Sequence, residues 1–191
     1  MTVPRSTDDY QVTDAQVAYR SRFTTIRVDQ VLMPDGHVGT REIAEHPSAV
    51  GAVVIDSDDT VVLLRHYRHA LAAFFLELPA GKLDVDGEPA AQAMQRELAE
   101  EVELQADTLT ELLTYTNSAG WTTERTTVYL ATDLVPAPRP EDFDLQHEEA
   151  DMDILRVPFD QAVAMVHDGQ IVDSKTVIGL LMVADRRRSR H

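Results

Sequence analysis

The sequence of 191 residues contains no cysteine, only one tryptophan, and about half as many basic residues as acidic ones. The lack of cysteine excludes disulfides, thiolate metal sites and cysteine nucleophiles, and it agrees with a cytoplasmic location. No apolar run is long enough to span a bilayer, and no apolar segment with basic flanks opens the chain. We therefore expect a cytoplasmic protein that has no membrane partner.

The charge balance is 17 Lys and Arg against 33 Asp and Glu, a formal net charge of −16. Because such a surface repels polyanions on average, we expect no nucleic-acid partner. A phosphate-bearing ligand would have to meet a local group of arginines or a bound cation. The basic run at 186–190 is expected to be a solvated, frayed helix end.

Hydrophobic spacing and turn residues divide the chain into a small β region, residues 1–45, and a mixed α/β domain, residues 46–191. Residues 1 to about 15 are polar and are expected to be loosely ordered. One helix is expected to start at Pro89, which suits a first helical position. The expected strands are 23–33, 38–44, 49–55, 60–68, 74–79, 109–116, 125–134 and 151–158, and two further helices are expected at 158–169 and 173–188.

Several glutamates gather at the C-terminal end of the helix that starts at Pro89, where the helix dipole disfavours them. Glu97 and Glu101 are four residues apart and flank an apolar stripe, with Glu100 at the edge. Their mutual repulsion costs about 0.2–0.5 kcal/mol per pair. A solvated acidic face is one interpretation. The other is a bound divalent cation, and oxygen ligands without nearby His or Cys favour Mg²⁺ or Mn²⁺.

This stretch resembles the Nudix box, G-x5-E-x7-R-E-U-x-E-E-x-G-U, in which U is aliphatic. The residues that fill the pattern are Gly81, Glu88, Arg96, Glu97, Leu98, Glu100, Glu101 and Leu104. The surrounding segments RHYRH, ELPAG, EEADM and DSKT are similar to those of the ADP-ribose pyrophosphatase branch, particularly its actinobacterial members. The resemblance implies an α/β/α sandwich with a mixed sheet, preceded by the small β region.

The sequence departs from the family pattern at three points. One extra residue lies between Gly81 and Glu88. Glu103 replaces the closing glycine of the box, so it must either adopt a positive φ, at a cost of about 1 kcal/mol, or let the helix continue. Ala119 stands where the branch usually has proline. We expect the chemistry to survive these changes and the substrate specificity to be affected by them.

The resemblance implies the following roles in the reaction. Glu97 and Glu101 would be the principal metal ligands, assisted by the Ala80 carbonyl and by Glu100. Arg96 would orient these glutamates by charge-assisted hydrogen bonds, the alternative being a surface salt bridge.

Two further roles are assigned to acidic residues, each with an alternative. Glu88 would either pin its loop by hydrogen bonds or act as a favourable charge near the helix N-terminus. The base that accepts a proton from water is assigned to Glu149, with Glu148 as the alternative, and a solvated acidic loop is the competing interpretation.

For the substrate, Arg68 is the expected diphosphate contact, because a guanidinium matches phosphate oxygens bidentately, the alternative being an ordinary arginine of an edge strand. Arg41 and Glu77 are weaker candidates for contacts with ribose or phosphate. Trp121 would either stack on a base or simply pack. His66 receives no role. The resemblance also implies a homodimer in which the N-terminal β region takes part in dimerisation and in the substrate pocket.

Three functions are compatible with these residues. The first is Mg²⁺-dependent hydrolysis of ADP-ribose to AMP and ribose 5-phosphate. The second is the same chemistry on another nucleoside diphosphate sugar, a possibility raised by Ala119. The third is a non-catalytic Nudix-like domain that binds a nucleotide and regulates a partner. Because all the glutamates of the box are kept, the two enzymatic functions are favoured over the third.

Overall fold

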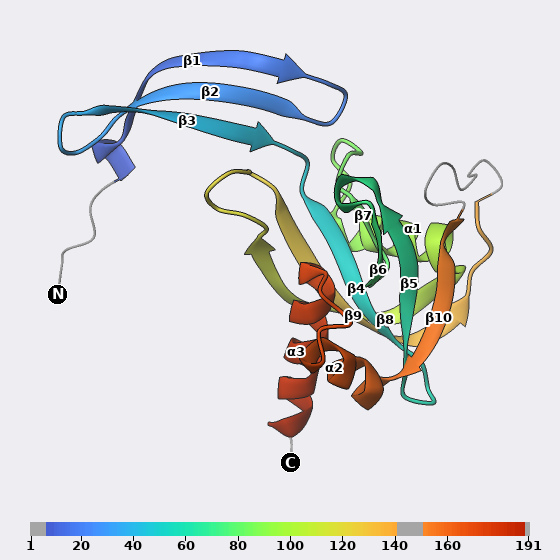
Figure 1. Cartoon of the computed structure of the whole chain (residues 1–191). Helices are drawn as coiled ribbons and strands as arrows, with labels where there is room; N and C mark the ends of the chain where they lie inside the picture. The colour runs from blue at the N-terminus through green and yellow to red at the C-terminus, as the bar shows by residue number, and fades with distance from the viewer. Residues whose placement is uncertain (1–6, 141–150, 190–191) are drawn as a thin grey trace. The chain divides into compact units, whose positions relative to one another are not determined.

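The structure is a computed structural model that describes residues 7–140 and 151–189. The chain forms two compact units, which are described separately (Figure 1). The N-terminal unit comprises Met1–Pro47 and Thr116–Arg125, and the larger unit comprises Ser48–Tyr115 and Thr126–His191. The segment Thr116–Arg125 therefore belongs to the N-terminal unit, although it lies far from the rest of that unit in the sequence.

The N-terminal unit is a three-stranded antiparallel sheet in the order β1-β2-β3. Its elements are a short 3-10 helix (Thr7–Asp9), β1 (Gln11–Arg20), β2 (Thr25–Leu32) and β3 (Val38–Glu45). The expectation of a loosely ordered start is wrong for residues 11–15, which pair with β2. Two irregularities in the register interrupt the alternation of side chains along β1, and every residue of the strand is exposed. Because β1 lacks a regular hydrophobic alternation, the sequence pattern did not indicate this strand.

Four strands of the larger unit differ in their bounds from those expected, among them the strand expected at 125–134, which continues to Pro136. Its elements are β4 (Ala49–Ile55), β5 (Thr60–Arg68), a 3-10 turn (His69–Leu71), β6 (Ala73–Glu77), β7 (Ala80–Lys82), α1 (Ala90–Val102), β8 (Leu104–Thr116), β9 (Arg125–Pro136), β10 (Asp153–Pro158), α2 (Phe159–His167) and α3 (Ser174–Arg188). The strand expected at 74–79 is split by Leu78 and Pro79 into β6 and β7. β8 begins at Leu104, five residues earlier than expected, and β10 begins at Asp153, two residues later.

The sheet of the larger unit is mixed. Its main path runs β10-β5-β4-β9-β8, with β6 paired to β5 and β7 paired to β4. The β4–β9 pair is parallel, whereas β4 is antiparallel to both β5 and β7. Because β7 adds to β4 where β5 no longer pairs with it, the backbone at 80–82 is held next to the centre of the sheet.

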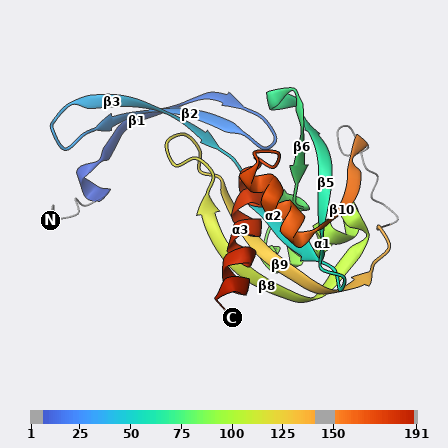
Figure 2. The same cartoon turned by 60° about the horizontal axis from the view of Figure 1, so that its bottom comes forward.

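Alternate residues of the central strands pack into two separate cores, one on each face of the sheet. On one face, Val50, Ala52 and Val54 of β4 lie in a core with the apolar stripe of α1. On the other, Val53 and Ile55 lie in a core with α2 and α3. Figures 1 and 2 show α1 on one side of the sheet and the other two helices opposite. This arrangement confirms the expected α/β/α sandwich, because burial on both faces requires helices on both sides.

The basic end of α3 is more strongly held than a frayed helix end. The Arg187 guanidinium makes two hydrogen bonds to Asp59, at 3.1 and 2.6 Å, and lies 4.0 Å above the ring of Phe159. The Arg186 side chain donates to the backbone oxygen of Leu112. These contacts fasten the end of α3 to the turn between β4 and β5 and to β8. Within the described residues, no helix has the length and apolar character needed to cross a membrane.

Candidate active site

The glutamates occupy the side of α1 next to its buried stripe. The helix follows Pro89 and buries Met94, Leu98 and Val102 against the sheet. Glu100 and Glu101, each 8% exposed, are also buried. Burial of carboxylates is costly unless they are hydrogen-bonded or neutralised by a cation. Their position therefore rules out a simple solvated acidic face.

One arginine organises most of these carboxylates. Arg96 donates to Glu88 through Nε and NH2 at 3.2 and 3.1 Å, and through NH1 to Glu97 at 2.8 Å and to Glu100 at 3.0 Å. The hydrogen bonds that Arg96 donates to Glu88, followed by the negative charges of Glu97 and Glu100, raise the Arg96 pKa above its usual value. We call Arg96 and the four glutamates Glu88, Glu97, Glu100 and Glu101 the acidic cluster. A single cation within it faces four anions.

The backbone at 80–81 lies directly against this cluster. The Ala80 amide donates to Glu101 Oε2 at 2.9 Å, which ties β7 to the end of α1. A Cβ placed on Gly81 would overlap the carboxyl group of Glu97. Glycine therefore allows the Glu97 carboxyl group to pack against the Gly81 α-carbon, and any larger residue would displace that carboxyl group.

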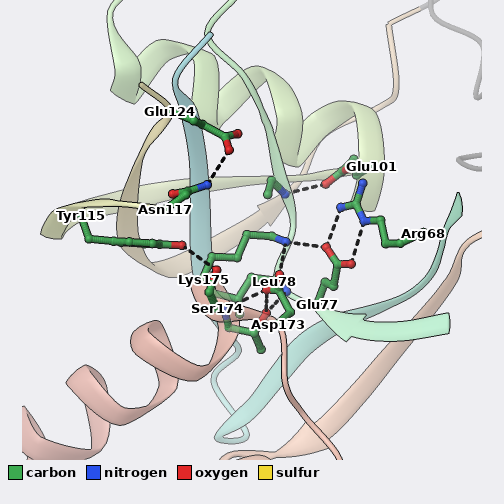
Figure 3. A network of polar contacts seen from close by, with 12 residues as sticks. Arg68, Glu77, Leu78, Glu101, Tyr115, Asn117, Glu124, Asp173, Ser174 and Lys175 are labelled. Atoms are coloured by element: carbon green, nitrogen blue, oxygen red, sulfur yellow. Dashed lines mark hydrogen bonds and ion pairs between the residues drawn. The ribbon is translucent and has the colours of Figure 1, made fainter. Parts of the chain in front are cut away.

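A second group of charges lies around the end of β6 (Figure 3). Arg68 donates to both oxygens of Glu77, through Nε at 2.7 Å and NH2 at 2.6 Å, and Lys175 of α3 forms an ion pair with the same carboxylate. Burial alone would raise the pKa of Glu77, but the hydrogen bonds from Arg68 and the charge of Lys175 outweigh it and lower the pKa to about 2. We call Arg68, Glu77 and Lys175 the Glu77 cluster. Lys175 also pairs with Asp173 at 3.1 Å, so two cations here face two carboxylates.

The first turn of α3 connects this cluster to the backbone next to the acidic cluster. The Asp173 side chain caps the helix by accepting from the Thr176 amide at 3.0 Å. The Thr176 hydroxyl donates to Asp173 and accepts from the Leu78 amide at 2.9 Å. Residues 77–80 are thus attached at one end to α3 and at the other, through Ala80, to α1.

The remaining predicted residues lie elsewhere. Arg41 and Trp121 belong to the N-terminal unit, where Arg41 is exposed and Trp121 is 52% exposed. The loop of Trp121 is joined to β3, since the Ala44 amide donates to the Trp121 carbonyl at 2.8 Å. Glu148 and Glu149 lie outside the described residues. The roles of all these residues remain predictions.

Comparison with known proteins identifies the family. The NUDIX domain matches residues 45–177, and a "nucleoside diphosphate sugar hydrolase N-terminal domain" matches residues 10–44. The chain belongs to the Nudix family.

Similar proteins support this membership over nearly the whole chain. An ADP-ribose pyrophosphatase of Mycobacterium tuberculosis is 39% identical over 92% of this chain and 83% of its own length. A methanol dehydrogenase activator of Bacillus methanolicus is 31% identical over 85% of both chains. The crystal structure of an "ADP compounds hydrolase" has a TM-score of 0.82 at 23% identity, covers 98% of both chains, and confirms the fold. The resemblance to the ADP-ribose pyrophosphatase branch is thereby confirmed, and the protein is a Nudix hydrolase.

The structure shows how the helix of this Nudix box ends without the closing glycine. Glu103 adopts the left-handed conformation, with φ 56° and ψ 40°, and α1 stops at Val102. Arg139 donates through Nε to the Glu100 carbonyl at 2.7 Å and forms an ion pair with Glu103 at 3.2 Å. A cation thus satisfies a free carbonyl at the helix C-terminus. Of the two outcomes that the sequence allowed, the positive φ is the one observed.

The acidic cluster fits the divalent cation that Nudix hydrolases use. Among residues 7–140 and 151–189, no three acidic or histidine side chains converge into a ready-made metal site. However, the carboxylates of Glu97, Glu100 and Glu101 share one buried side of α1, where a divalent cation would offset their mutual repulsion. Carboxylate oxygens of this kind suit Mg²⁺ or Mn²⁺.

Sequence reasoning missed two charged residues of the larger unit, Lys175 and Arg139. The DSKT segment contributed to the resemblance, but none of its residues was given a role. The D-x-x-T spacing of Asp173 and Thr176 is a helix-capping signal and indicates where α3 begins. It does not indicate that Lys175 reaches a carboxylate 98 positions earlier.

Proposed function

We propose that this Nudix hydrolase cleaves the diphosphate linkage of ADP-ribose with water, giving AMP and ribose 5-phosphate, in the presence of Mg²⁺ or Mn²⁺ in the cytoplasm. The observation that carries the proposal is the complete acidic cluster, which keeps every glutamate of the box in a chain 39% identical to an ADP-ribose pyrophosphatase. A regulator that only binds a nucleotide has no need of these buried carboxylates.

In this proposal the chain's own groups divide the work. Glu97, Glu101 and the Ala80 carbonyl would hold the cation, with Glu100 beside them. When bound, the cation neutralises phosphate charge and acidifies a water molecule. Arg96 keeps the Glu97 and Glu100 carboxylates oriented through hydrogen bonds of 2.8 and 3.0 Å. Glu88 fixes Arg96 in turn, with two hydrogen bonds to its guanidinium.

Arg68 would contact the diphosphate, as a guanidinium suits paired phosphate oxygens. Its side chain is 44% exposed while its Nε and NH2 are held by Glu77, so the NH1 edge of the fork remains available for a ligand. Glu149, or else Glu148, would accept the proton of the attacking water.

A second substrate class is another nucleoside diphosphate sugar. Two observations favour it: the match of residues 10–44 to the N-terminal domain of nucleoside diphosphate sugar hydrolases, and Ala119 in the loop that carries Trp121. Both concern the N-terminal unit, where Arg41 and Trp121 are the proposed contacts with ribose, phosphate or base.

A homodimer is part of the same proposal. Strand β1 exposes Val12, Val17 and Tyr19, each more than half accessible to solvent. Apolar side chains gathered on one strand of a three-stranded sheet are a typical subunit contact. Light scattering on the purified protein would show twice the chain mass of 21.3 kDa if the dimer forms.

The test is a substrate panel with the purified protein, Mg²⁺ and a chromatographic assay of the products. ADP-ribose, ADP-glucose, GDP-mannose and UDP-glucose are compared at equal concentration, with and without EDTA. AMP release from ADP-ribose that EDTA abolishes supports the proposal. Faster cleavage of another sugar nucleotide moves the assignment to that substrate. Tight binding of ADP-ribose with no turnover of any of the four would overturn the enzymatic proposal.

A further inference from the structure

Lys175 is a nearly buried lysine in the first turn of α3, and no role in the reaction has so far been given to it. Its side chain is 12% exposed, and its Nζ forms ion pairs with Glu77 and, at 3.1 Å, with Asp173. Its aliphatic stem lies beside β4, with Cδ 3.6 Å from the place where a Cβ on Gly51 would stand. The stem is thus confined between the sheet and α3, and Nζ is directed at the Glu77 carboxylate (Figure 3).

Neutralising Glu77 does not require this lysine. Arg68 already binds both oxygens of Glu77 in a bidentate pair, which is a complete partner for a carboxylate. Enclosing a lysine there as well costs desolvation and rotamer freedom. Lys175 also pairs with Asp173 at 3.1 Å, so its contact with Glu77 adds a second anchor to a carboxylate that Arg68 already neutralises.

The shared oxygen gives that function a geometric basis. Glu77 Oε2 accepts from both Arg68 NH2 and Lys175 Nζ. Lys175 therefore fixes the carboxylate plane, and the carboxylate plane fixes the plane of the Arg68 guanidinium. Glu77 is only 3% exposed, so water has little access with which to replace either contact.

The position of Arg68 connects the Glu77 cluster to the acidic cluster. Among the charges that act on Arg68 is that of Glu101, the carboxylate that accepts from the Ala80 amide. Arg68 thus lies within electrostatic range of a proposed metal ligand. If the Arg68 guanidinium rotated, its positive charge would move relative to the place where the diphosphate is expected.

We propose that Lys175 is a positioning residue for the substrate diphosphate: through Glu77 it holds the Arg68 guanidinium with its NH1 edge toward the phosphate oxygens. This inference rests on the proposed function, because it assigns the diphosphate to the side of α1 that carries Glu101. It requires that the effect of Lys175 on substrate binding pass through Arg68.

The experiment is a double-mutant cycle between K175M and R68Q, with KM and kcat measured for ADP-ribose. We expect K175M to raise KM about tenfold with kcat within about threefold, since the misplaced contact is one of binding. R68Q should raise KM more, and K175M added to R68Q should change it less than twofold. K175R, which keeps a cation on Glu77, should recover most of the loss. R156M is the control for loss of a cation. Arg156 lies on the edge strand β10, and its ion pair with Asp56 is lost in this variant.

A measurement without turnover separates this inference from the proposed function. The affinity for α,β-methylene ADP-ribose is measured by calorimetry for the same variants. K175M should weaken binding of the analogue in the wild-type background and should leave it unchanged in the R68Q background. An equal KM change by K175M in both backgrounds would overturn the positioning role, as would a lowered melting temperature with unchanged KM and affinity. If K175M does not fold, K175Q and K175R supply the comparison. A wild-type protein that neither binds the analogue nor cleaves any sugar nucleotide would remove both proposals.

Discussion

The two charged clusters of the larger unit differ in their balance of charge. In the acidic cluster one arginine pairs with three of the four glutamates, whereas around Glu77 an arginine and a lysine face two carboxylates, those of Glu77 and Asp173. Residues 77–80 join the two clusters, since Glu77 lies at one end of that segment and Ala80 contacts Glu101 from the other. An excess of negative charge suits a divalent cation and the guanidinium of Arg68 suits phosphate, so a diphosphate bound to a cation would complement both.

The largest expected effect comes from removing one charge of the acidic cluster. E101Q keeps the shape of the side chain and its hydrogen bond from Ala80 but loses a proposed metal ligand. We expect kcat/KM to fall about a thousandfold or more. The melting temperature should not fall, because repulsion among the carboxylates is relieved. The exposed E111Q on β8 is the matched control, and unchanged activity in E101Q would refute the metal assignment.

The Glu77 cluster should be broken by pH as well as by mutation. The pKa of Glu77 falls from the ordinary 4.5 to about 2 on folding, so as the pH falls the unfolded chain binds the proton first. The contribution of Glu77 is complete above about pH 5 and is lost as the pH falls from 4.5 to 2, on the order of 3 kcal/mol.

E77Q is the variant that tests this dependence. It removes the anion that Arg68 and Lys175 share and leaves Lys175 with Asp173 alone, so it should lower the unfolding free energy at pH 7 by a similar amount and flatten the pH dependence below pH 5. Urea unfolding of both proteins between pH 3 and pH 7 measures the difference. Parallel pH profiles for wild type and E77Q would contradict the assignment.

A third prediction tests the acidic cluster without changing any charge. In G81A the new methyl group displaces the Glu97 carboxylate, which is the flexible end of a side chain, so the fold should persist. Displacement by about 1 Å is expected to lower kcat/KM about a hundredfold. V85A, at an exposed position of the following loop, should stay within twofold of wild type. Full activity in G81A would show that the position of Glu97 is not critical.

The smallest effect concerns the ion pair between Arg139 and Glu103 at the C-terminal end of α1. Arg139 and Glu103 match one to one, and Glu103 is 57% exposed, so their ion pair contributes little. E103G should relieve the positive φ and raise the unfolding free energy by about 1 kcal/mol, with activity within twofold. E103A keeps the strained conformation and should bring no gain. A loss of stability in E103G would mean that the ion pair outweighs the strain.

Much of the larger unit could be predicted from the sequence because its signals are local. The spacing of Met94, Leu98 and Val102 placed one face of α1 in a core, and the same spacing placed Glu97 and Glu101 beside it. The apolar runs at 49–55 and 60–68, separated by turn residues, indicated β4 and β5. The family was implied by the resemblance to the Nudix box, and both the fold class and the family are confirmed.

The features that the sequence did not predict depend on contacts between distant segments. Lys175 meets Glu77 only because α3 packs beside β6, and Arg139 reaches the end of α1 from beyond β9. The conformation of Glu103 was left open because helix propensity alone does not decide it, whereas the contacts from Arg139 and Ala137 do. Strand β1 was missed because irregular register and exposure removed its alternation.

The contacts of residues 77–80 also indicate at which positions this chain should accept an inserted residue. Glu77 binds two cations, Leu78 binds Thr176, the Pro79 carbonyl accepts from Ala52, and Ala80 binds Glu101. One inserted residue would turn half of these groups to the opposite side. The extra residue of this Nudix box lies instead between Gly81 and Glu88, where positions 84–87 are all exposed. Insertions and deletions among relatives should therefore occur in that loop and be absent from the four residues that precede Gly81.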